Sequence, residues 1–475
     1  MLTFDENGDL APGCAEKWET SDDGLKWTFH LRDGLKWSDG SPLSAKDFVY
    51  SWKRVADPKT GSAYAETFLF PVKGFDEAIN GNVDALCVSA PDDLTFVVEL
   101  SSPCTYFESL VTFVTLSPVQ EKTIKENGDT WSSSTDTLIS NGPFYISEWE
   151  PDSYIIISKN PNYWNADKIK LGSIKWVLGD NGYDSYNAYK NGDILFTKVL
   201  PSSEVSSLSA NDDFYVDPII GTYYITLNTK SAPFNNPLVR KALSLAIDRE
   251  YVAKTIMEGT CTPATNLVGP GWKDPTGGDF ITKANNGKTY ISDDYEKNLE
   301  EAKALMKQAG YKADPENPDI LITYTTNDNG YHVDLELYLR QAWKELGVDL
   351  KGKIVEWDEF FPSHFDGNFE LCRGGWIGDY PDPSSLLDLM YTNSGLNDAN
   401  YSSPDFDATI DTARSASNPT ARSNALHKAE DIIMQEAPII PVVYYGDIWL
   451  QSEKIQGMWH TATGYFNFIY ADITK

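Results

Sequence analysis

The 475-residue sequence has few cysteines, few histidines and no cluster of basic residues. The cysteines are odd in number, widely spaced and without a C-x-x-C pair: Cys14, Cys87, Cys104, Cys261 and Cys372. That distribution indicates neither a zinc site nor a disulfide framework. The five histidines are equally scattered, and none has a second ligand at metal spacing. We therefore expect no bound metal and no cofactor.

Positive charge is scarce as well. The chain has 39 lysines and arginines against 70 aspartates and glutamates, which gives a net charge of −31. A surface of that sign repels phosphate backbones, so nucleic acid is not expected as a partner. Such a charge is typical of an exported or salt-exposed protein that must stay in solution.

The common catalytic motifs are missing. The sequence has no G-x-S-x-G elbow, no H-E-x-x-H pair, no phosphate loop and no dinucleotide fingerprint. Asp379 and Asp382 leave a glycosidase-like acid and base as an alternative. Pro381 and Pro383 stiffen that segment, however, and we expect no enzymatic activity.

One further pattern imitates a calcium loop. Asp5, Asn7, Asp9 and Glu16 stand at offsets that resemble those of calcium ligands. Leu10, however, occupies the position at which such a loop needs glycine for its sharp turn. The segment therefore predicts a plain β-turn.

Long apolar runs are also absent. None approaches the ~20 residues that a membrane-spanning helix needs. The chain opens Met-Leu-Thr-Phe-Asp-Glu-Asn-Gly, without the basic start and apolar centre of a signal peptide. Taken alone, this opening indicates a cytoplasmic protein, an interpretation that the motifs below reverse.

What the sequence does contain is typical of a globular α/β protein. Its hydrophobic content is 41% with 13% aromatics, and its length suits two or three domains. Ser44 followed by Asp47 predicts a helix N-terminus. Turn-rich β hairpins give way near residue 230 to alternating strands and helices, which predicts a domain boundary there. The expected helices are 236 towards 259, 292–308, 333–346 and 418–436, and the expected strands are 26–31, 93–100, 141–146, 154–157, 320–325, 348–355, 369–377 and 439–445.

The most informative segment is Arg373-Gly-Gly-Trp-Ile-Gly-Asp-Tyr-Pro-Asp-Pro-Ser-Ser-Leu-Leu. Its adjacent glycines leave backbone that another backbone can approach closely. In an extended strand Arg373, Gly375, Ile377 and Asp379 share one face. The pattern predicts a cradle for an extended zwitterion, with an amine held at Asp379 and a carboxylate nearer Arg373.

Several longer motifs extend the argument to the whole chain. They are Leu10-Ala-Pro-Gly-Cys-Ala-Glu-Lys-Trp-Glu, Trp27-Thr-Phe-His-Leu-Arg-Asp-Gly, Asn141-Gly-Pro-Phe-Tyr-Ile, Asn160-Pro-Asn-Tyr-Trp and Phe234-Asn-Asn-Pro-Leu-Val-Arg-Lys. In this order, and together with Gly375-Trp-Ile-Gly-Asp-Tyr-Pro-Asp-Pro, the sequence resembles the extracytoplasmic oligopeptide-binding proteins of ABC importers, solute-binding protein family 5.

The resemblance implies a bilobed, periplasmic-binding-protein-like α/β fold of the Venus-flytrap type, with an additional domain inserted in the N-terminal lobe. Residues 1–10, 120–221 and 446–475 would form the N-terminal lobe, 11–119 the inserted domain and 222–445 the second lobe. Relatives carry a first strand and helix before the stretch that opens this chain. We therefore expect an N-terminal truncation that removes the first unit of that lobe, along with any signal peptide or lipid anchor.

The resemblance also assigns site residues. Asp379 matches the aspartate that pairs with the α-amino group of the peptide, and Arg373 a basic residue on its C-terminal side. The remaining positions are implied to pair with peptide backbone or to line pockets: Gly375, Ile377, Trp376, Tyr445 and Tyr64. Trp376 and Tyr445 have ordinary core packing as an alternative, and Arg373 a role as counter-ion to nearby acids.

Two features bear on ligand length. Arg373 and Asp379 are at most ~20 Å apart in an extended chain, which leaves room for about three to six ligand residues. Where some relatives carry further basic residues for the ligand carboxylate, this chain has Met257 and His364, so the preferred length stays open.

The function implied is that of a substrate-binding component of an ABC peptide importer. It would act in the periplasm or on the outer face of the cytoplasmic membrane, as a monomer, and deliver short peptides to a membrane permease and its ATPase. The alternatives are a binder of dipeptides, nickel complexes or oligosaccharides, or a signalling-peptide receptor on the same fold.

Overall fold

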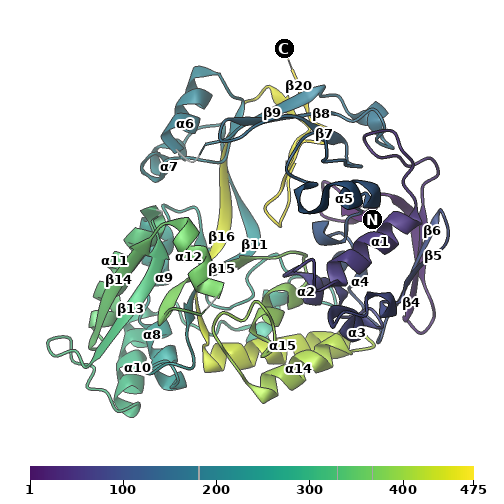
Figure 1. The fold of residues 1–475 in the computed structure, drawn as a ribbon. Helices are drawn as coiled ribbons and strands as arrows, with labels where there is room; N and C mark the ends of the chain where they lie inside the picture. Colours follow the sequence, from purple (N-terminus) through teal and green to yellow (C-terminus); the bar gives the residue numbers. More distant parts are fainter. Residues whose placement is uncertain (180–181, 329, 366, 475) are drawn as a thin grey trace.

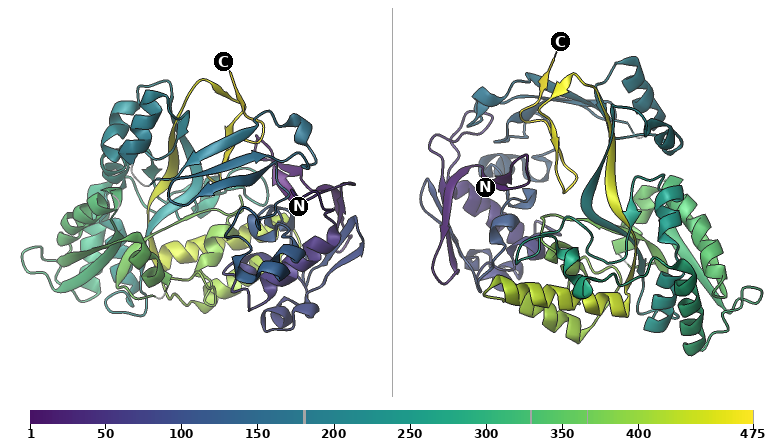
Figure 2. Two further views of the ribbon diagram at one scale, coloured as in Figure 1. Left: turned by 45° about the horizontal axis from the view of Figure 1, so that its top comes forward. Right: turned by 180° about the vertical axis from the view of Figure 1, so that it is seen from behind.

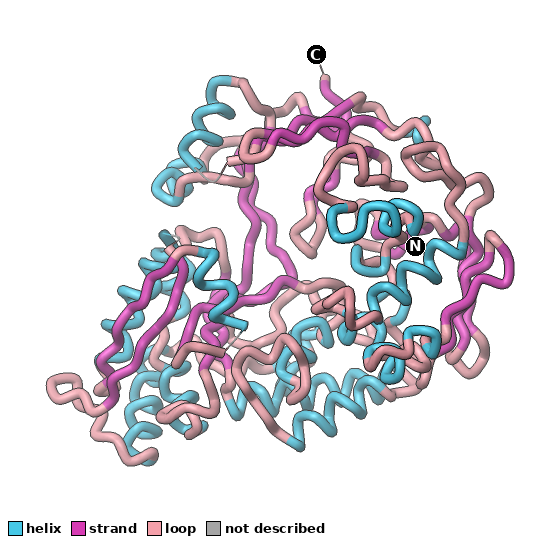
Figure 3. Tube along the Cα trace, viewed as in Figure 1, coloured by secondary structure: helices cyan, strands magenta, loops and turns pink. Residues whose placement is uncertain are grey.

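The computed structural model describes residues 1–179, 182–328, 330–365 and 367–474. Its ribbon forms a teal body at the top of Figure 1, a purple body at the right and a green-to-yellow body below. Two long strands, β11 (Phe214–Leu227) and β16 (Ile439–Gln451), run from the top body into the lower one, and the same connection is visible from behind in Figure 2. Strands and helices lie in separate layers in the lower body (Figure 3).

The purple body is an antiparallel sheet covered by helix α1 (Ala45–Ala56). The sheet order is β3 (Ala15–Thr20), β4 (Lys26–Leu31), β6 (Thr95–Glu99) and β5 (Val88–Asp92). Aromatic side chains fill the space between sheet and helix, with the rings of Trp52 and Phe96 at 5.1 Å. The strand predicted at 26–31 is confirmed, and the one predicted at 93–100 is present but shorter.

Ser44 caps α1 as the sequence predicts. Its side chain accepts from the Lys46 N–H at 3.3 Å, while Asp47 Oδ2 accepts from the Ser44 N–H at 2.8 Å. This reciprocal arrangement satisfies two backbone donors that a helix N-terminus leaves unpaired.

Removing this cap is expected to loosen the first turn of α1. We expect Ser44→Ala to destabilise that turn by about 1 kcal/mol, because one backbone donor loses its acceptor. Hydrogen exchange of the α1 amides measures the change. Ser132→Ala, at an exposed position outside any helix or strand, serves as the matched control. Equal exchange in both variants would contradict the capping role.

The top body contains a three-stranded antiparallel sheet. Its strands are β7 (Phe144–Glu150), β8 (Tyr154–Lys159) and β9 (Ser173–Val177). The hairpin predicted around residue 150 is therefore confirmed. No side chain of these three strands is fully buried, although several are large and apolar.

The lower body is built on the largest sheet. From one edge its order is β10 (Phe196–Thr197), β16, β11, β15 (Leu371–Ile377), β13 (Ile320–Asn327) and β14 (Val348–Val355), with β12 (Thr262–Pro263) also paired to β16. β13 is parallel to β14 and to the start of β15, and β11 is antiparallel to both of its neighbours. Helices cover this sheet: α8 (Pro237–Leu245), α10 (Tyr295–Gln308), α11 (Gly330–Lys344), α14 (Pro404–Arg414) and α15 (Pro419–Glu436).

The two long strands change register twice, between Pro218 and Thr222 and again between Tyr223 and Tyr224. Pro218 pairs with Gly446, and the next pair is Thr222 with Tyr444. Residues 219–221 therefore oppose a single residue of β16. A bulge of this kind bends the strands and strengthens their twist. The bend lies where the strands pass from the top body into the lower one (Figure 1).

One predicted helix is interrupted. The apolar periodicity from 236 towards 259 predicts a continuous helix, whereas the structure has α8, then α9 (Arg249–Tyr251) and a π-helical turn (Val252–Ile256). The Asp248 carboxylate accepts from the Tyr251 N–H at 3.0 Å, so a new helix begins there. Short acids compete for backbone donors in this way, and periodicity alone does not reveal it.

The remaining elements are short: β1 (Leu2–Phe4), β2 (Leu10–Pro12), α2 (Ala65–Leu69), α3 (Phe75–Ile79), α4 (Phe107–Leu110), α5 (Glu121–Asn127), α6 (Gly182–Asn191), α7 (Ser202–Leu208), α12 (Trp357–Phe365), α13 (Ser384–Leu387), β17 (Ile455–Gln456), β18 (Trp459–His460), β19 (Phe466–Asn467) and β20 (Asp472–Ile473). Between β1 and β2, Asp5 Oδ1 accepts from the N–H groups of Asn7 and Asp9, which makes the expected turn.

Candidate functional site

Strand β15 has a free edge beside the segment that the sequence singles out. One edge of β15 pairs with β11 over the whole length of β15. At the other edge, β13 pairs only with Leu371 and Cys372. From Arg373 to Ile377, no strand among the described residues pairs with the second edge. A free edge of this kind can accept an additional strand.

The backbone groups of alternate residues point to that edge. The Gly378 N–H donates to the Ile220 carbonyl on the β11 side at 2.7 Å. Because successive residues of a strand direct their backbone groups to opposite edges, Gly375 and Ile377 direct theirs away from β11. The two positions predicted to pair with a ligand therefore face the free edge.

Gly375 lies directly under a tyrosine. A Cβ atom at this position would be 2.1 Å from Tyr445 Oη and 3.4 Å from the Thr222 carbonyl oxygen. No side chain fits there without displacement of Tyr445. The structure therefore brings together two residues that the sequence predicts for the site, although they are far apart in the chain.

Asp379 lies half-buried just after β15. Tyr64 Oη and Ser385 Oγ each donate to its carboxylate at 3.4 Å, and its own N–H donates to Ser385 Oγ at 2.9 Å. Burial raises the pKa of Asp379 to about 6, a rise that hydrogen bonds from Ser385, Trp376 and Tyr64 oppose. No cation lies within ion-pair distance of this carboxylate in the described parts of the chain.

Trp376 packs between the same carboxylate and the core of the lower body. Its Nε1 is buried and meets no acceptor with good hydrogen-bond geometry among the residues described, yet it lies near enough to Asp379 to favour the charged form. The position of Trp376 is therefore compatible with both roles considered for it, packing in the core and lining of a ligand pocket.

The residues that follow Asp379 are anchored in the purple body. Tyr380 is buried in the core of that body and stacks on Tyr106, with ring centroids 6.1 Å apart. Asp382 is buried and pairs with Arg422 at 2.6 Å, and the guanidinium of Arg422 lies 3.7 Å above the Tyr106 ring. A carboxylate held in this way is a structural ion pair. The acid and base suggested by the spacing of Asp379 and Asp382 are therefore not available as a pair.

Arg373 lies at the other end of the free edge. Its Nε donates to Asn327 Oδ1 at 2.7 Å, and its guanidinium faces the rings of Trp357 and Phe360 at 5.1 and 4.9 Å. Within the described chain, no carboxylate lies at ion-pair distance from Arg373. Aromatic rings hold a cation in place and leave its outer N–H groups for a ligand.

Neither of the other two positions considered for a ligand carboxylate carries a charge that would serve it. Met257 is buried, and its carbonyl accepts from the N–H and the hydroxyl of Thr260. Burial and the nearby Arg373 lower the pKa of His364 to about 4. Its Nε2 lies 3.2 Å from Asp398 Oδ2, and burial raises the pKa of Asp398 to about 7.

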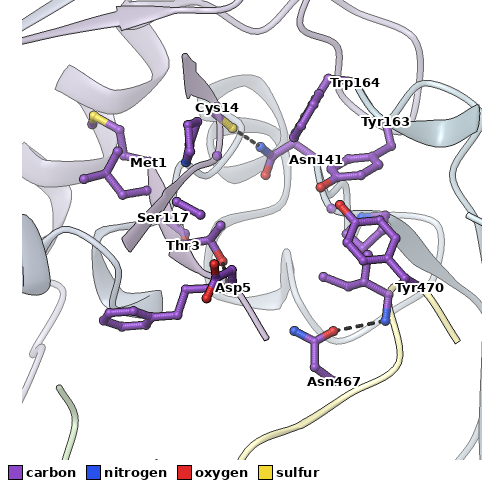
Figure 4. Close-up of a pocket in the computed structure, with 18 of the residues that line it drawn as sticks. Met1, Thr3, Asp5, Cys14, Ser117, Asn141, Tyr163, Trp164, Asn467 and Tyr470 are labelled. Atoms are coloured by element: carbon purple, nitrogen blue, oxygen red, sulfur yellow. Dashed lines mark hydrogen bonds between the residues drawn. The ribbon is translucent and has the colours of Figure 1, made fainter. Parts of the chain in front are cut away.

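A separate cavity of about 330 Å³ lies around the first residues of the chain (Figure 4). Asn141 Nδ2 donates to Cys14 Sγ there at 3.2 Å, and the rings of Tyr163 and Trp164 form one wall. Burial lowers the pKa of the Met1 amino group. None of the predicted site residues lines this cavity.

Sequence reasoning missed some residues around Asp379 and Arg373. Ser385 lies within the quoted motif, where its hydroxyl could have been considered. Asn327 is the last residue of β13 and Trp357 is the first of α12, but neither lies in a recognisable motif. Tyr465 comes from the C-terminal segment, and its pKa is raised by burial and, to a smaller extent, by the charge on Asp379. Only the folded chain brings these side chains to the site.

Two α/β bodies joined by a bent strand pair, with an exposed strand edge between opposite charges, define a binding protein that holds an extended ligand. A family model for bacterial extracellular solute-binding proteins, family 5 Middle, matches residues 9–398. The chain belongs to this family of bacterial extracellular solute-binding proteins, and its fold is the bilobed one of periplasmic binding proteins.

Individual relatives agree with this assignment. The oligopeptide-binding protein OppA of Bacillus subtilis (strain 168) is 34% identical over 483 residues, which cover 99% of this chain and 86% of that protein. The crystal structure of Haemophilus influenzae OppA in complex with RPPGFSPFR has a TM-score of 0.87 at 29% identity, covering 100% of this chain and 92% of that one.

A third relative is informative about conformation. A structure of the Escherichia coli murein tripeptide binding protein MppA has a TM-score of 0.87 at 29% identity and covers 100% of this chain and 92% of that one. An unliganded open form of MppA has a TM-score of only 0.69 at 30% identity, with 96% and 87% covered. The lobes of this chain are therefore arranged less like that open form than like the other MppA structure.

No helix in the described part of the chain combines the length and the apolar character that a bilayer crossing requires.

Proposed function

We propose that this protein is the substrate-binding component of an ABC peptide importer. It captures short peptides in the periplasm or at the outer face of the cytoplasmic membrane and delivers them to a membrane permease and its ATPase. It acts as a monomer and performs no chemistry. Residues 1–10, 120–221 and 446–475 form one lobe, 222–445 the other, and 11–119 the inserted domain. The first register break in β11 and β16, between Pro218 and Thr222, lies at the boundary of this division.

The observation that carries this proposal is the carboxylate of Asp379. It is half-buried, its pKa is raised to about 6 by burial, and no cation pairs with it in the described residues. A buried carboxylate is stable as an anion only with a charged or strong hydrogen-bonding partner. The α-ammonium group of a peptide supplies such a partner, with hydrogen bonds of the stronger, charge-assisted kind.

The free edge of β15 supports recognition of the peptide main chain. Gly375 and Ile377 direct backbone groups to it, and Arg373 lies at the end opposite Asp379. Main-chain pairing does not depend on side-chain identity, so many peptides bind with similar affinity. One named relative binds a murein tripeptide and another was solved with RPPGFSPFR, so ligand length varies within the family.

Closure of the lobes around the peptide is the signal for the permease. Lys273 contacts the β1–β2 turn, where its Nζ donates to the Gly8 carbonyl at 3.2 Å and lies 3.9 Å from an Asp9 carboxylate oxygen. These exposed contacts are weak and can break when the lobes open. A contact between the lobes stabilises the closed form only. A ligand that binds the closed form more tightly shifts the equilibrium between the open and closed forms in the same direction.

The first test is a calorimetric titration with tetra-alanine and with its N-acetylated form. We expect the free-amine peptide to bind and the acetylated peptide to bind at least about 100-fold more weakly, because the amide carries no charge for Asp379. Tryptophan fluorescence gives an independent readout of the same titration. Equal binding of both peptides would remove Asp379 as the anchor, and binding of neither would remove the proposed function.

Binding is also expected to depend on pH. The ammonium group binds the charged form of Asp379, whose pKa in the free protein is about 6. Affinity should therefore be highest near pH 7 and fall as pH decreases through 6, by up to about tenfold per pH unit. It should fall again above about pH 8, where the amino group of the peptide loses its proton. If the ammonium group binds the charged form, Asp379 releases a proton on binding at pH values below 6. Calorimetry in buffers of different ionisation enthalpy measures this proton release. Affinity that rises towards pH 5 would contradict this assignment.

A further inference from the structure

The segment that carries Asp379 is fixed on both sides by different parts of the molecule. On one side the Gly378 N–H donates to the Ile220 carbonyl at 2.7 Å. The Ile220 N–H donates in turn, also at 2.7 Å, to the Ala462 carbonyl in the loop between β18 and β19. On the other side Tyr380 is 1% exposed and packs in the core of the purple body. The position of Asp379 therefore depends on the purple body as well as on the lower one.

Arg422, on helix α15, lies behind this segment. It is 1% exposed, and its Nη2 donates to Asp382 Oδ1 at 2.6 Å and to Ser384 Oγ at 3.1 Å. The N–H and the hydroxyl of Ser384 also donate to Asp382 Oδ1, at 2.9 and 2.7 Å. The next residue, Ser385, is the one whose hydroxyl contacts both the N–H and the carboxylate of Asp379. The guanidinium thus holds the turn from which Ser385 reaches the anchor.

The flat face of the same guanidinium lies against a ring of the purple body. Its carbon atom Cζ is 3.7 Å from the centroid of the Tyr106 ring. Nε and Nη1 of Arg422 are buried and meet no acceptor with good hydrogen-bond geometry among the residues described. The ring face therefore supplies the second favourable contact of a charge that has left water. Figures 1 and 2 show α15 lying against the purple body.

A series of ring contacts leads from Tyr106 back to the anchor. Tyr106 stacks on Tyr380 with ring centroids 6.1 Å apart, and Tyr380 meets the ring of Phe68 edge to face at 5.9 Å. Phe68 packs on Tyr64 at 5.7 Å, and Tyr64 donates to the Asp379 carboxylate at 3.4 Å. Because buried rings are closely packed, displacement of one of them shifts its neighbours. The ring that supports Arg422 is therefore connected to a hydrogen-bond donor of the anchor.

We propose that Arg422 is a positioning residue for the amine anchor, and that the purple body takes part in peptide recognition by holding Arg422 through Tyr106. This inference rests on the proposed peptide-binding function and adds to it. Arg422 is too deeply buried to touch a ligand. It acts through the turn that carries Ser385 and through the rings that lead to Tyr64. Without it the Asp379 carboxylate is displaced from the place at which its hydrogen bonds to an ammonium group are short.

The experiment measures the dissociation constants of tetra-alanine and of its N-acetylated form by calorimetry, for the full chain and for Arg422→Met. The constant for the acetylated peptide, divided by that for the free-amine peptide, reports how well the protein recognises the charged amine. We expect Arg422→Met to lower this ratio about tenfold, a usual size for residues coupled in one hydrogen-bond network. A purely structural role would reduce the fraction of competent protein, weaken both peptides by the same factor and leave the ratio unchanged.

Variants of Tyr106 test the part played by the purple body. Tyr106→Leu removes the ring face under the guanidinium and should lower the ratio by a similar factor. Tyr106→Phe removes only a hydroxyl group that is buried and meets no partner with good hydrogen-bond geometry in the described residues, so its ratio should equal that of the unmodified protein. Equal ratios in the leucine and phenylalanine variants would contradict a role for the ring.

Arg414 provides a matched control. Its guanidinium also lies over a ring of the purple body, Phe70 at 4.7 Å, and pairs with a carboxylate of the lower body, Asp388 at 2.9 Å. Within the described residues, Asp388 makes no hydrogen bond to Asp379. Arg414→Met therefore removes a similar contact between the same two bodies and should leave the ratio unchanged. An equal fall in both methionine variants would mean that any weakening of this interface has the same effect, and the inference would be wrong.

A double variant guards against misfolding. Arg422→Met alone leaves the buried carboxylate of Asp382 without its cation, which destabilises a fold strongly. Asp382→Asn combined with Arg422→Met leaves no unpaired charge, so it should melt close to the unmodified protein and still have the lowered ratio.

The outcomes separate the two proposals. If the unmodified protein does not bind tetra-alanine, the proposed function is wrong, and this inference fails with it. If the unmodified protein distinguishes the two peptides and the folded double variant distinguishes them equally well, Arg422 does not position the anchor. If Tyr106→Leu keeps the full ratio, the purple body has no part in recognition of the amine.

Discussion

Replacing Asp379 by asparagine is expected to weaken binding of a free-amine peptide by about 100-fold or more. The substitution keeps the shape of the side chain but removes the charge that the ammonium group would pair with, and lost partners of buried charge pairs cost this much in other complexes. The N-acetylated peptide, which binds weakly in any case, should be almost unaffected. Calorimetric titration of each protein with each peptide gives the four dissociation constants that the comparison needs.

The stability of the same variant distinguishes lost binding from misfolding. Burial raises the pKa of Asp379 from its ordinary 3.8 to about 6, so the folded protein favours the neutral form. The contribution of this group to stability is complete below pH 3.8 and is lost as pH rises through 6. Asp379→Asn should therefore melt no lower than the unmodified protein at pH 8.

The matched control for this variant is Glu77→Gln, at an exposed position on α3. It removes one negative charge at a distance from the site, and its affinity should be unchanged. Undiminished affinity in Asp379→Asn would contradict the anchor, whereas equal losses in both variants would indicate a general effect of net charge.

Gly375→Ala is expected to have the second-largest effect. The new Cβ would be 2.1 Å from Tyr445 Oη, so either the tyrosine or strand β15 must move. Forced displacements of this kind cost about 1 to 3 kcal/mol. Because the backbone of Gly375 faces the free edge, we expect at least tenfold weaker binding of tetra-alanine, measured by calorimetry.

A second substitution tests the cause. Tyr445→Phe removes the hydroxyl group, after which the nearest remaining ring atom is 3.1 Å from the new Cβ. The double variant should therefore recover part of the affinity that Gly375→Ala loses. Gly395→Ala is the control, since an added Cβ there meets no atom within 4 Å. Normal binding by Gly375→Ala would show that the free edge of β15 does not receive the peptide.

Local patterns in the sequence predicted many elements of the purple and lower bodies. Cap residues, glycines after helices and alternating apolar positions are properties of a few neighbouring residues, which is why the helix that begins after Ser44 and the strand that ends at Ile377 are where they were expected. The break at Asp248 was missed because a short acid within an apolar stripe resembles an exposed position of one helix.

Long-range pairing accounts for what the sequence did not reveal. β11 was not predicted at all, and β16 is longer than the strand expected at 439–445, because both extend through a bend that only their pairing defines. The family resemblance assigned the site residues individually, without any contact between them. In the structure Tyr64 donates to Asp379, and Tyr445 lies over Gly375. Their roles towards a ligand stay predictions, as do the expected truncation and the division into domains.

The two hydrogen bonds of Ile220 have a consequence for how this protein can change over evolution. Both use main-chain atoms, the N–H towards Ala462 and the carbonyl towards Gly378. Exchange of the side chain for another apolar one would alter packing but leave these bonds in place. Only proline, which has no N–H, would remove the first of them. Sequences can therefore diverge at position 220 and keep the backbone connection between the β18–β19 loop, the bend in β11 and the segment that contains Asp379.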